Sequence, residues 1–529
     1  MAFLRQSIAL LRWQDSESSQ LRSNDPQIFR LGFVFRRITS VSRYCRVVWL
    51  LSASLLGPAA TSAGAETVQY LSYLGGAQAD SLAGAAVGPD GDLYVAGTTS
   101  SDNLPAAGRY QTARKGGQDV FVVRLRGADR SLVWVSYLGG SRDDTVADVA
   151  VDSNGNVVVA GVTWSDDFPV STDAFQSSLE GRTDGFVAGL SADGKTLQFS
   201  TYLGGSADDE ASCLILDADG KPVVAGITRS GDLRVRAAVQ KTLGGARDVF
   251  LARLSTDGRS VDYLTYMGGN RDDQPFDLAL NEQGHLLVTG STASDENFPL
   301  VNPLQESRSG SSDAFVLELD PSGDSVLFSS YLGGRGGETG YCVVPTPSGE
   351  LLIGGETSSS DLGLVDPIQS AYVGSGDAFV IRIAADYSAV DFATYLGGAG
   401  NDSLRDCRLD EFGRLNGVGV TRSADFPLVG TVQSKLSGPA DLFFVVVDPR
   451  RATLDFSSLL GGSGTEIPGG MTTADGTLIA AGVTTSTDLP AFGGPREQLR
   501  FPGGGMYRSI NEGAQWSQTP TATTDPNVE

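Results

Sequence analysis

The sequence predicts an all-β protein, a seven-bladed β-propeller of four-stranded antiparallel blades that is closed by its N-terminal strand. Three observations predict this fold. A Tyr-Leu-Gly-Gly mark or a close variant recurs seven times, at intervals of 64, 65, 64, 65, 64 and 64 residues. Each interval holds four short apolar segments, which is typical of one propeller blade. The array also opens with a lone fourth segment. The first glycine of each mark is Gly75, Gly139, Gly204, Gly268, Gly333, Gly397 or Gly461.

The second copy shows the expected elements of one blade in order. Its strands are expected at residues 146–152, 156–163, 184–190 and 196–203. Asn154-Gly155 suits the first hairpin turn, because this pair readily adopts positive φ angles. A longer polar loop separates the second strand from the third. The strands are apolar nearly throughout, which fits sheets that are packed on both faces.

The same turn and strand-end residues recur in the other copies. We interpret them as architecture, because glycine permits tight turns and close approach, and Thr and Asp bond local backbone groups at strand ends. The second strand ends in Gly-x-Thr in every copy. The first hairpin carries Gly91, Gly155, Gly220, Gly284, Gly349, Gly413 and Gly476, and the third strand opens with Asp119, Asp184, Asp248, Asp313, Asp377 and Asp441.

The two ends of the array are expected to complete one blade together. The array begins with the lone strand 68–74, and the last copy has clear first and second strands. A third strand is expected within residues 503–510. The N-terminal strand would then be the outer strand of the seventh blade, which removes an exposed sheet edge.

The N-terminal region has the pattern of a secretory signal peptide. Four arginines up to Arg46 precede the apolar run 47–56, and Ala63-Gly64-Ala65 follows as a cleavage pattern. We expect cleavage before Glu66, and translation starting downstream of Met1, because the basic region lies far from it. The alternative is a short membrane anchor. The predicted divisions are a leader at 1–65, the propeller at 66–510 and a tail at 511–529.

Charge and cysteine content narrow the class of protein. Beyond residue 65 the chain has 31 basic and 60 acidic residues, which disfavours nucleic acid and anionic lipid as partners. No later segment is long and apolar enough to span a membrane. Besides Cys45 in the leader, the chain has Cys213, Cys342 and Cys407, which we interpret as buried free thiols inside strands.

The repeat resembles the bacterial SBBP family, named for its seven-bladed β-propeller. The resemblance rests on Tyr-Leu-Gly-Gly-Ser-x-Asp-Asp, Val-Ala-Val-Asp-x-x-Gly-Asn-Val-x-Val-Ala-Gly-x-Thr, Ser-x-Asp-Phe-Pro and Asp-x-Phe-Val, and it spans roughly residues 68–510. It implies an exported or surface protein that acts as a binding scaffold, with no defined activity. Residues 509–516 also resemble one degenerate Asp-box, from which no sialidase activity follows.

One set of residues has the composition of a functional site. Five residues after each glycine mark stands an acid, and we call this set the acidic ring. Its members are Asp80, Asp144, Asp209, Asp273, Glu338, Asp402 and Glu466. We prefer a structural role, in which each acid accepts backbone N–H bonds and ties neighbouring blades together. The alternatives are a calcium site at the mouth of the channel and paired carboxylates of a glycosidase or lyase.

Other chemistry is sparse. Asp148, Asp277 and Asp406 occupy a second acidic position in alternate copies, and the only histidine, His285, lies beside a hairpin glycine. No phosphate-binding loop or multi-histidine zinc site is evident. We therefore expect no catalytic residues and no cofactor.

The predicted function is a monomeric, non-enzymatic scaffold, secreted, periplasmic or at the cell surface, that binds a protein or glycan. A carbohydrate-active enzyme and a calcium-binding surface protein are the alternatives.

Overall fold

The structure is a computed structural model that describes residues 47–54, 67–106, 108–474, 477–490, 499–500, 507–509 and 516–518. Within these ranges the regular secondary structure consists of β-strands. The same residues include no helix long and apolar enough to cross a membrane. The predicted cleavage site before Glu66 and the hairpin glycine Gly476 lie outside the described residues.

Six sheets of the described chain have four antiparallel strands each, in sequence order across the sheet. The first three are β3 (Asp80–Val87), β4 (Leu93–Thr99), β5 (Asp119–Leu125) and β6 (Leu132–Leu138); β7 (Asp144–Val151), β8 (Val157–Thr163), β9 (Asp184–Leu190) and β10 (Leu197–Leu203); and β11 (Asp209–Leu216), β12 (Pro222–Thr228), β13 (Asp248–Leu254) and β14 (Val261–Met267). The next three are β15 (Asp273–Leu280), β16 (Leu286–Thr292), β17 (Asp313–Leu319) and β18 (Val326–Leu332); β19 (Glu338–Pro345), β20 (Leu351–Thr357), β21 (Asp377–Ile383) and β22 (Val390–Leu396); and β23 (Asp402–Leu409), β24 (Leu415–Thr421), β25 (Asp441–Asp448) and β26 (Thr453–Leu460).

A further sheet joins the two ends of the chain. Its order is β27 (Glu466–Ala474), β28 (Thr477–Thr484), β1 (Val47–Ser54), β2 (Thr67–Gly75) and β29 (Leu499–Arg500). The orphan strand therefore lies in the same sheet as the last two strands of the array, in the fourth place. Separately, β30 (Tyr507–Ser509) pairs with β31 (Trp516–Gln518), with Ser509 opposite Trp516.

The third strand of this last sheet differs from the expected one. Residues 503–510 were the predicted third strand, whereas β1, from the apolar run of the leader, pairs with both β28 and β2. An apolar run of eight residues suits a strand that is flanked on both sides as well as it suits a signal peptide. Of the predicted segment, residues 507–509 are described, and they form β30.

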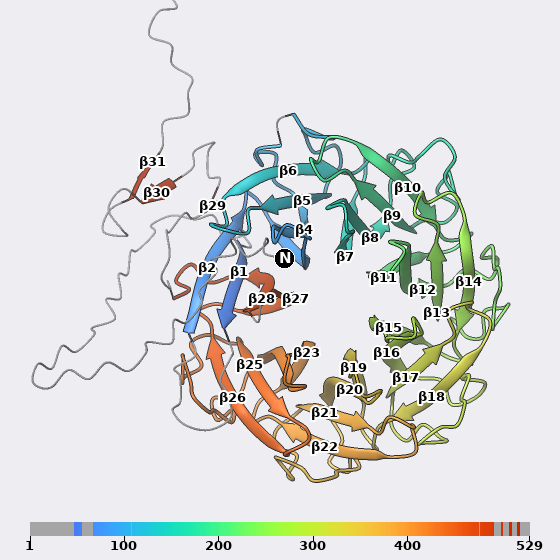
Figure 1. The fold of residues 1–529 in the computed structure, drawn as a ribbon, viewed down its shortest axis with the longest axis vertical. Helices are drawn as coiled ribbons and strands as arrows, with labels where there is room; N and C mark the ends of the chain where they lie inside the picture. The colour runs from blue at the N-terminus through green and yellow to red at the C-terminus, as the bar shows by residue number, and fades with distance from the viewer. Residues whose placement is uncertain are drawn as a thin grey trace, which may run out of the picture.

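The sheets follow one another around a ring, with the first strand of each bordering its centre (Figure 1). We call β3, β7, β11, β15, β19, β23 and β27 the inner strands. The hydrophobic core lies between neighbouring sheets: Tyr94 and Val122 of one sheet pack with Val159 and Phe186 of the next. Ile479 of β28 likewise packs with Leu82 of β3. Each sheet therefore buries both of its faces.

Local turn chemistry explains the hairpins. The described hairpin glycines between first and second strands have φ angles from 76° to 91°, a region in which a side chain is strained. The glycines of the recurring mark have a different role, which appears at the acidic ring below.

The prediction of three buried free thiols was wrong for two of them. Cys342 of β19 and Cys407 of β23 form a disulfide between adjacent inner strands, with their Cα atoms 5.8 Å apart. These residues stand at positions that differ by one in their two copies, so counting from the glycine mark did not reveal the pair. Cys213 is a buried free thiol.

Candidate functional site

The acidic ring stands at the first residue of each inner strand. All seven carboxylates are buried, with exposed fractions between 0 and 2%. In every copy the carboxylate accepts a hydrogen bond from the N–H of the second glycine of the mark. It also accepts one from a serine hydroxyl two residues beyond the Gly-x-Thr threonine.

Asp144 shows the arrangement in detail. Its carboxylate accepts from the Gly140 N–H at 2.6 Å and from the Ser165 hydroxyl at 3.1 Å, and the Thr163 hydroxyl donates to the other oxygen. Thr163 ends β8, and Gly140 belongs to the crossover from β6 to β7. The acid therefore joins the crossover between two sheets to the end of the second strand.

A second carboxylate from the preceding sheet faces six of the seven crossovers of the described chain, all but the one from β2 to β3. Asp119, at the start of β5, accepts from the Gly116 N–H at 2.9 Å and from Nε2 of Gln111 at 3.0 Å. The amide oxygen of Gln111 in turn accepts from the Gly139 N–H at 3.1 Å. A Cβ atom on Gly139 would lie 2.6 Å from the Asp119 carboxyl carbon and 2.8 Å from Asp144 Oδ2. Close packing between two acids therefore explains the glycine.

The glutamine is a functional position that the sequence analysis missed. It recurs as Gln111, Gln176, Gln240, Gln305, Gln369 and Gln433, and in each case it bridges the third-strand aspartate and the first glycine of the mark. Its constant distance from the glycine mark was visible in the sequence and could have identified it.

Burial sets the protonation of these acids. Desolvation raises the pKa of Asp144 and of Asp273 to about 6, although hydrogen bonds from Thr, Ser and glycine N–H groups oppose the shift. The neighbouring Asp119 carboxylate adds to the rise in the pKa of Asp144. Burial also raises the pKa of the remaining acids of the ring. Paired carboxyl groups fill the six crossovers that follow a third-strand aspartate, and among the described residues Asp80 stands alone at the crossover from β2 to β3.

Every inner strand contains a β-bulge three residues after its acid. The ladder skips one residue there, and the seven skipped residues, which we call the bulge residues, are Ala83, Ala147, Ser212, Phe276, Tyr341, Arg405 and Gly469. β-Bulges redirect side chains and are frequent next to functional sites. The repeat is conspicuously broken at this position, since four residues are small and three are large.

The three large bulge residues are neighbours on β15, β19 and β23, and we call them the bulge sector. The rings of Phe276 and Tyr341 lie 4.9 Å apart, edge to face. The guanidinium carbon of Arg405 lies 4.0 Å from the centre of the Tyr341 ring, a cation–π contact. Arg405 also forms an ion pair with Glu356 at 3.4 Å, and its side chain is 37% exposed. The sector thus presents aromatic and cationic groups that remain partly accessible.

The residue after the bulge supplies the second acidic position. Asp148 accepts from the Val149 N–H at 2.7 Å and, across the sheet boundary, from the Leu214 N–H at 2.9 Å. Asp277 and Asp406 accept from the inner strand of the next sheet in the same way. These aspartates therefore join adjacent inner strands in pairs. Arg408 donates to Asp406 at 2.6 Å.

The protonation of these three acids is also shifted by burial. Desolvation raises the pKa of Asp148 to about 6, and it raises the pKa of Asp277 and Asp406 as well, while the Arg408 cation opposes all three shifts.

The remaining sequence candidates contribute little chemistry. His285 lies at the β15–β16 hairpin, with its Nδ1 atom 2.7 Å from Glu318. Among the described residues, no group of three His, Cys, Asp or Glu side chains is placed to hold a metal ion. The acids of the ring lie one to a crossover and do not converge with one another.

Comparison with known proteins defines the class of the repeat. Residues 133–169 match the model of the SBBP beta-propeller repeat, so the resemblance predicted from the sequence is confirmed for that stretch. The chain is 25% identical over 438 residues to the regulatory protein FlaEY of Caulobacter vibrioides, which covers 78% of this chain and 43% of that protein. The chain therefore spans less than half of that relative.

Two solved structures have a loose likeness to this one. BamB from Moraxella catarrhalis has a TM-score of 0.35 and 11% identity, covering 79% of this chain and 88% of its own. A europium-containing methanol dehydrogenase has a TM-score of 0.35 and 10% identity, covering 66% of each chain. No function follows from either.

Replacing Asp144 by Ala is expected to destabilise the protein by about 1–3 kcal/mol, because it leaves the Gly140 N–H and two hydroxyls without their buried acceptor. Urea unfolding measures the loss. Asp166→Ala, at an exposed loop position, is the control and should change stability little. We expect calcium to have no effect on either protein; a chelator-reversible calcium stabilisation that Asp144→Ala abolishes would contradict the structural role.

Mild acid is expected to stabilise the protein. The folded pKa of Asp144 and Asp273, about 6, lies above the unfolded value of about 3.9. Their contribution is therefore greatest below the unfolded pKa and is lost as pH rises through the folded pKa. The melting temperature should rise as pH falls from 7.5 to 5. High salt is the control, because it screens exposed charges and leaves buried ones. A melting temperature that falls over this window would contradict the prediction.

Proposed function

We propose that this chain is an exported, non-enzymatic scaffold, a closed seven-bladed propeller, that binds a protein or glycan through the bulge sector. The observation that carries this proposal is the contrast at the bulge. The acidic ring, its glutamines and its glycines repeat almost unchanged, whereas large bulge residues occur in one sector only. A scaffold that is uniform except for one sector suits recognition there, because partner contacts vary without disturbing the framework.

The composition of the bulge sector supports recognition. Aromatic residues and arginine are the side chains that dominate binding energy at interfaces. Phe276, Tyr341 and Arg405 are all partly exposed, so an acceptor on a partner can reach the exposed part of the Arg405 side chain. A protein partner also fits the regulatory name of the FlaEY relative.

The arrangement of the acids favours the scaffold over the hydrolase or lyase alternative. Each acid of the ring accepts hydrogen bonds from its own crossover and strand end, and in six of the seven both carboxylate oxygens accept them; in Asp209 the Oδ2 atom accepts them, and Oδ1 is buried without a partner among the described residues. A glycosidase instead needs two carboxyl groups that flank one substrate bond. The same engagement supports the structural role over calcium binding.

The ring arrangement supports closure. β2 lies in one sheet with β27 and β28, and that sheet packs against β3 through Ile479 and Leu82. The chain would thus close as seven blades, with the propeller at 66–510 followed by the tail at 511–529.

Export is supported by two independent features. The basic residues, apolar run and Ala63-Gly64-Ala65 have the order of a signal peptide. The Cys342–Cys407 disulfide is of a kind that persists in oxidising compartments. Cleavage before Glu66 would remove β1, and the C-terminal segment 503–510 would then take its place between β28 and β2.

The binding proposal is tested with the secreted protein on glycan and protein arrays, followed by titration of the strongest partner. Tyr341→Ala combined with Arg405→Ala should weaken binding at least tenfold, because both the stacking surface and the cation are lost. Ser212→Ala, at a bulge residue outside the sector, is the matched control and should bind normally. Undiminished binding by the double variant would place the interface elsewhere, and turnover of a glycan by the wild-type protein would indicate an enzyme.

The export proposal predicts a mature N-terminus at Glu66. N-terminal sequencing of protein recovered from the periplasm or medium measures it. An intact leader on protein that remains in the cytosol would contradict export. Mass spectrometry of a non-reduced digest should also recover the linked Cys342 and Cys407 peptides.

A further inference from the structure

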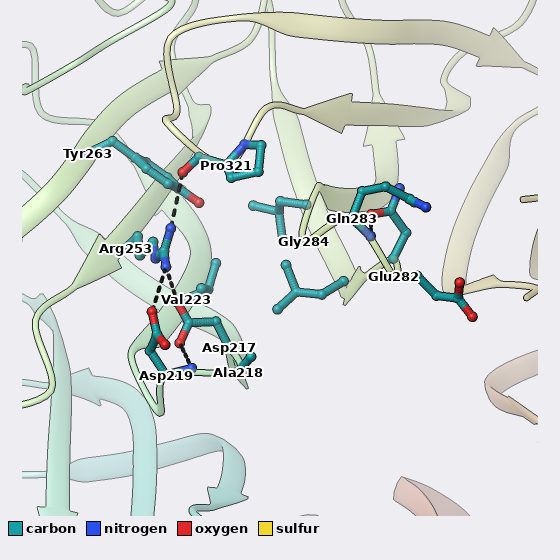
Figure 2. A pocket seen from close by; sticks show the side chains of 13 residues that line it. Asp217, Ala218, Asp219, Val223, Arg253, Tyr263, Glu282, Gln283, Gly284 and Pro321 are labelled. Atoms are coloured by element: carbon teal, nitrogen blue, oxygen red, sulfur yellow. Dashed lines mark hydrogen bonds and ion pairs between the residues drawn. The ribbon is translucent and has the colours of Figure 1, made fainter.

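A pocket of about 380 Å³ lies between the β11–β14 sheet and the β15–β18 sheet (Figure 2). Its wall includes Val223, Arg253 and Tyr263 of one sheet, and Gly284 and Pro321 at hairpins of the next. Figure 2 shows the Arg253 guanidinium between the Pro321 carbonyl and the acids Asp217 and Asp219. This pocket is at a boundary between sheets and is separate from the bulge sector.

The corresponding place between the β3–β6 and β7–β10 sheets is filled by Tyr94. Tyr94 pairs with Arg124 across its sheet as Val223 pairs with Arg253. The Tyr94 hydroxyl donates to the Gly155 carbonyl at 3.1 Å, and the guanidinium carbon of Arg124 lies 5.4 Å from the centre of its ring. Trp134 meets the same ring edge to face at 6.2 Å. The phenol ring of Tyr94 is therefore held at this boundary by a hydrogen bond, a cation–π contact and an edge-to-face aromatic contact.

Three differences from the β3–β6 sheet leave the same space open at the pocket, at a position that also varies elsewhere, with Val158 in the β7–β10 sheet and Leu287 in the β15–β18 sheet. Val223 stands in place of Tyr94, and the smaller Tyr263 stands in place of Trp134. Asp217 stands in place of Gly88, where a Cβ atom would lie 2.8 Å from Cε2 of Tyr94. The two positions correspond because the Gly88 N–H donates to the Asp92 carbonyl and the Asp217 N–H donates to the Lys221 carbonyl, across the first hairpin of each sheet. The β11–β14 sheet thus lacks the phenol ring that the β3–β6 sheet has here.

Three polar groups near the pocket have no hydrogen-bond partner among the described residues. The Gly284 carbonyl corresponds to the Gly155 carbonyl, since both glycines follow the same turn with φ near 80°. Within the described residues, the Gly284 carbonyl receives no hydrogen bond. The Tyr263 hydroxyl also has no hydrogen-bond partner there, although the residue is only 2% exposed. Nε of Arg253 is likewise buried without one.

We propose that this pocket binds a small hydroxylated aromatic ring, a phenol, in the place that Tyr94 fills at the corresponding boundary. The ligand hydroxyl donates to the Gly284 carbonyl and accepts from the Tyr263 hydroxyl. Arg253 lies beside the ring as Arg124 lies beside Tyr94, and Val223 with Leu286 supplies the apolar contact. Apolar side chains of this kind, beside a few placed polar groups, are what a site for a small aromatic ring requires.

The charge of the pocket selects among phenols. The lining holds one arginine and three acids, Asp217, Asp219 and Glu282, so the site is acidic overall. Anionic substituents would be repelled by these carboxylates. Neutral phenols and phenols with an amino group are therefore favoured over hydroxybenzoates.

The test is titration of the full chain with phenol, p-cresol, 4-hydroxybenzoate and toluene, followed by ligand-observed NMR and thermal melting. Phenol and p-cresol should bind saturably and raise the melting temperature. Toluene, which lacks the hydroxyl, and 4-hydroxybenzoate should bind at least several-fold more weakly. Absence of saturable phenol binding would overturn the proposal. Toluene binding equal to that of phenol would overturn it as well, and so would a pocket that binds the sugar methyl glucoside saturably and does not bind phenol.

Matched variants place the ligand in the pocket. Asp217→Gly is the single-variant reference, and it measures what loss of this carboxylate does to phenol binding. Asp217→Gly with Val223→Tyr recreates the Gly88 and Tyr94 pair, and should weaken binding at least tenfold relative to Asp217→Gly alone. Val223→Leu, which introduces the residue found as Leu352 at the corresponding place in the β19–β22 sheet, should weaken binding even if the double variant fails to fold. Equal binding by Val223→Leu and wild type would overturn the assignment.

Discussion

Each described crossover between neighbouring sheets depends on a buried carboxylate that holds a glycine turn. At the β6–β7 crossover, Gly139 lies between Asp119 of one sheet and Asp144 of the next, and Gln111 bonds both the first acid and the glycine N–H. Burying two like charges near one another is costly unless each is fully hydrogen-bonded. The network provides those bonds, and glycine is needed because any side chain would occupy the space of the carboxylates.

This constraint explains which parts of the repeat vary. The crossover residues take part in one network per boundary, so a change in one of them leaves several polar groups unsatisfied. The bulge residues lie outside that network, and so do second-strand residues such as Val223 that pack at the boundary between two sheets. They differ from sheet to sheet: Tyr341 and Arg405 stand where Ala83 and Ala147 stand elsewhere, and Val223 stands where one sheet has Tyr94 and others have Val158 or Leu287. Both proposed binding sites therefore use positions that vary between sheets.

The sequence predicted the repeated part of the structure well, because the residues that form it recur at a constant interval. The four strands per copy, the turn glycines and the aspartates that open the third strands all followed from periodic patterns, whereas Asp144 was expected just before its strand and in fact begins it. The partners of the acids did not, because Ser165 and Gln111 are distant from Asp144 and Asp119 in the chain and meet them only after folding. The sequence analysis also missed the bulges, since one skipped residue leaves an apolar strand pattern unchanged.

The remaining errors have similar physical causes. Cys342 and Cys407 pair although their positions differ by one, because adjacent inner strands are not aligned residue for residue across a sheet boundary. The apolar run 47–54 has the composition of both a signal peptide and a strand, and the pattern alone does not choose between them. The pocket at Val223 depends on volumes at three separated positions, which only the packing of two sheets brings together.

Native-state hydrogen exchange of the crossover glycines tests the central claim most directly. If buried carboxylates hold the crossovers, the amides of Gly140, Gly205 and Gly269 exchange as slowly as amides within the inner strands, because their acceptors are buried and open only with the sheets. Rapid exchange of these amides, at the rate of exposed loops, would show that the carboxylates do not hold the crossovers and would contradict the account.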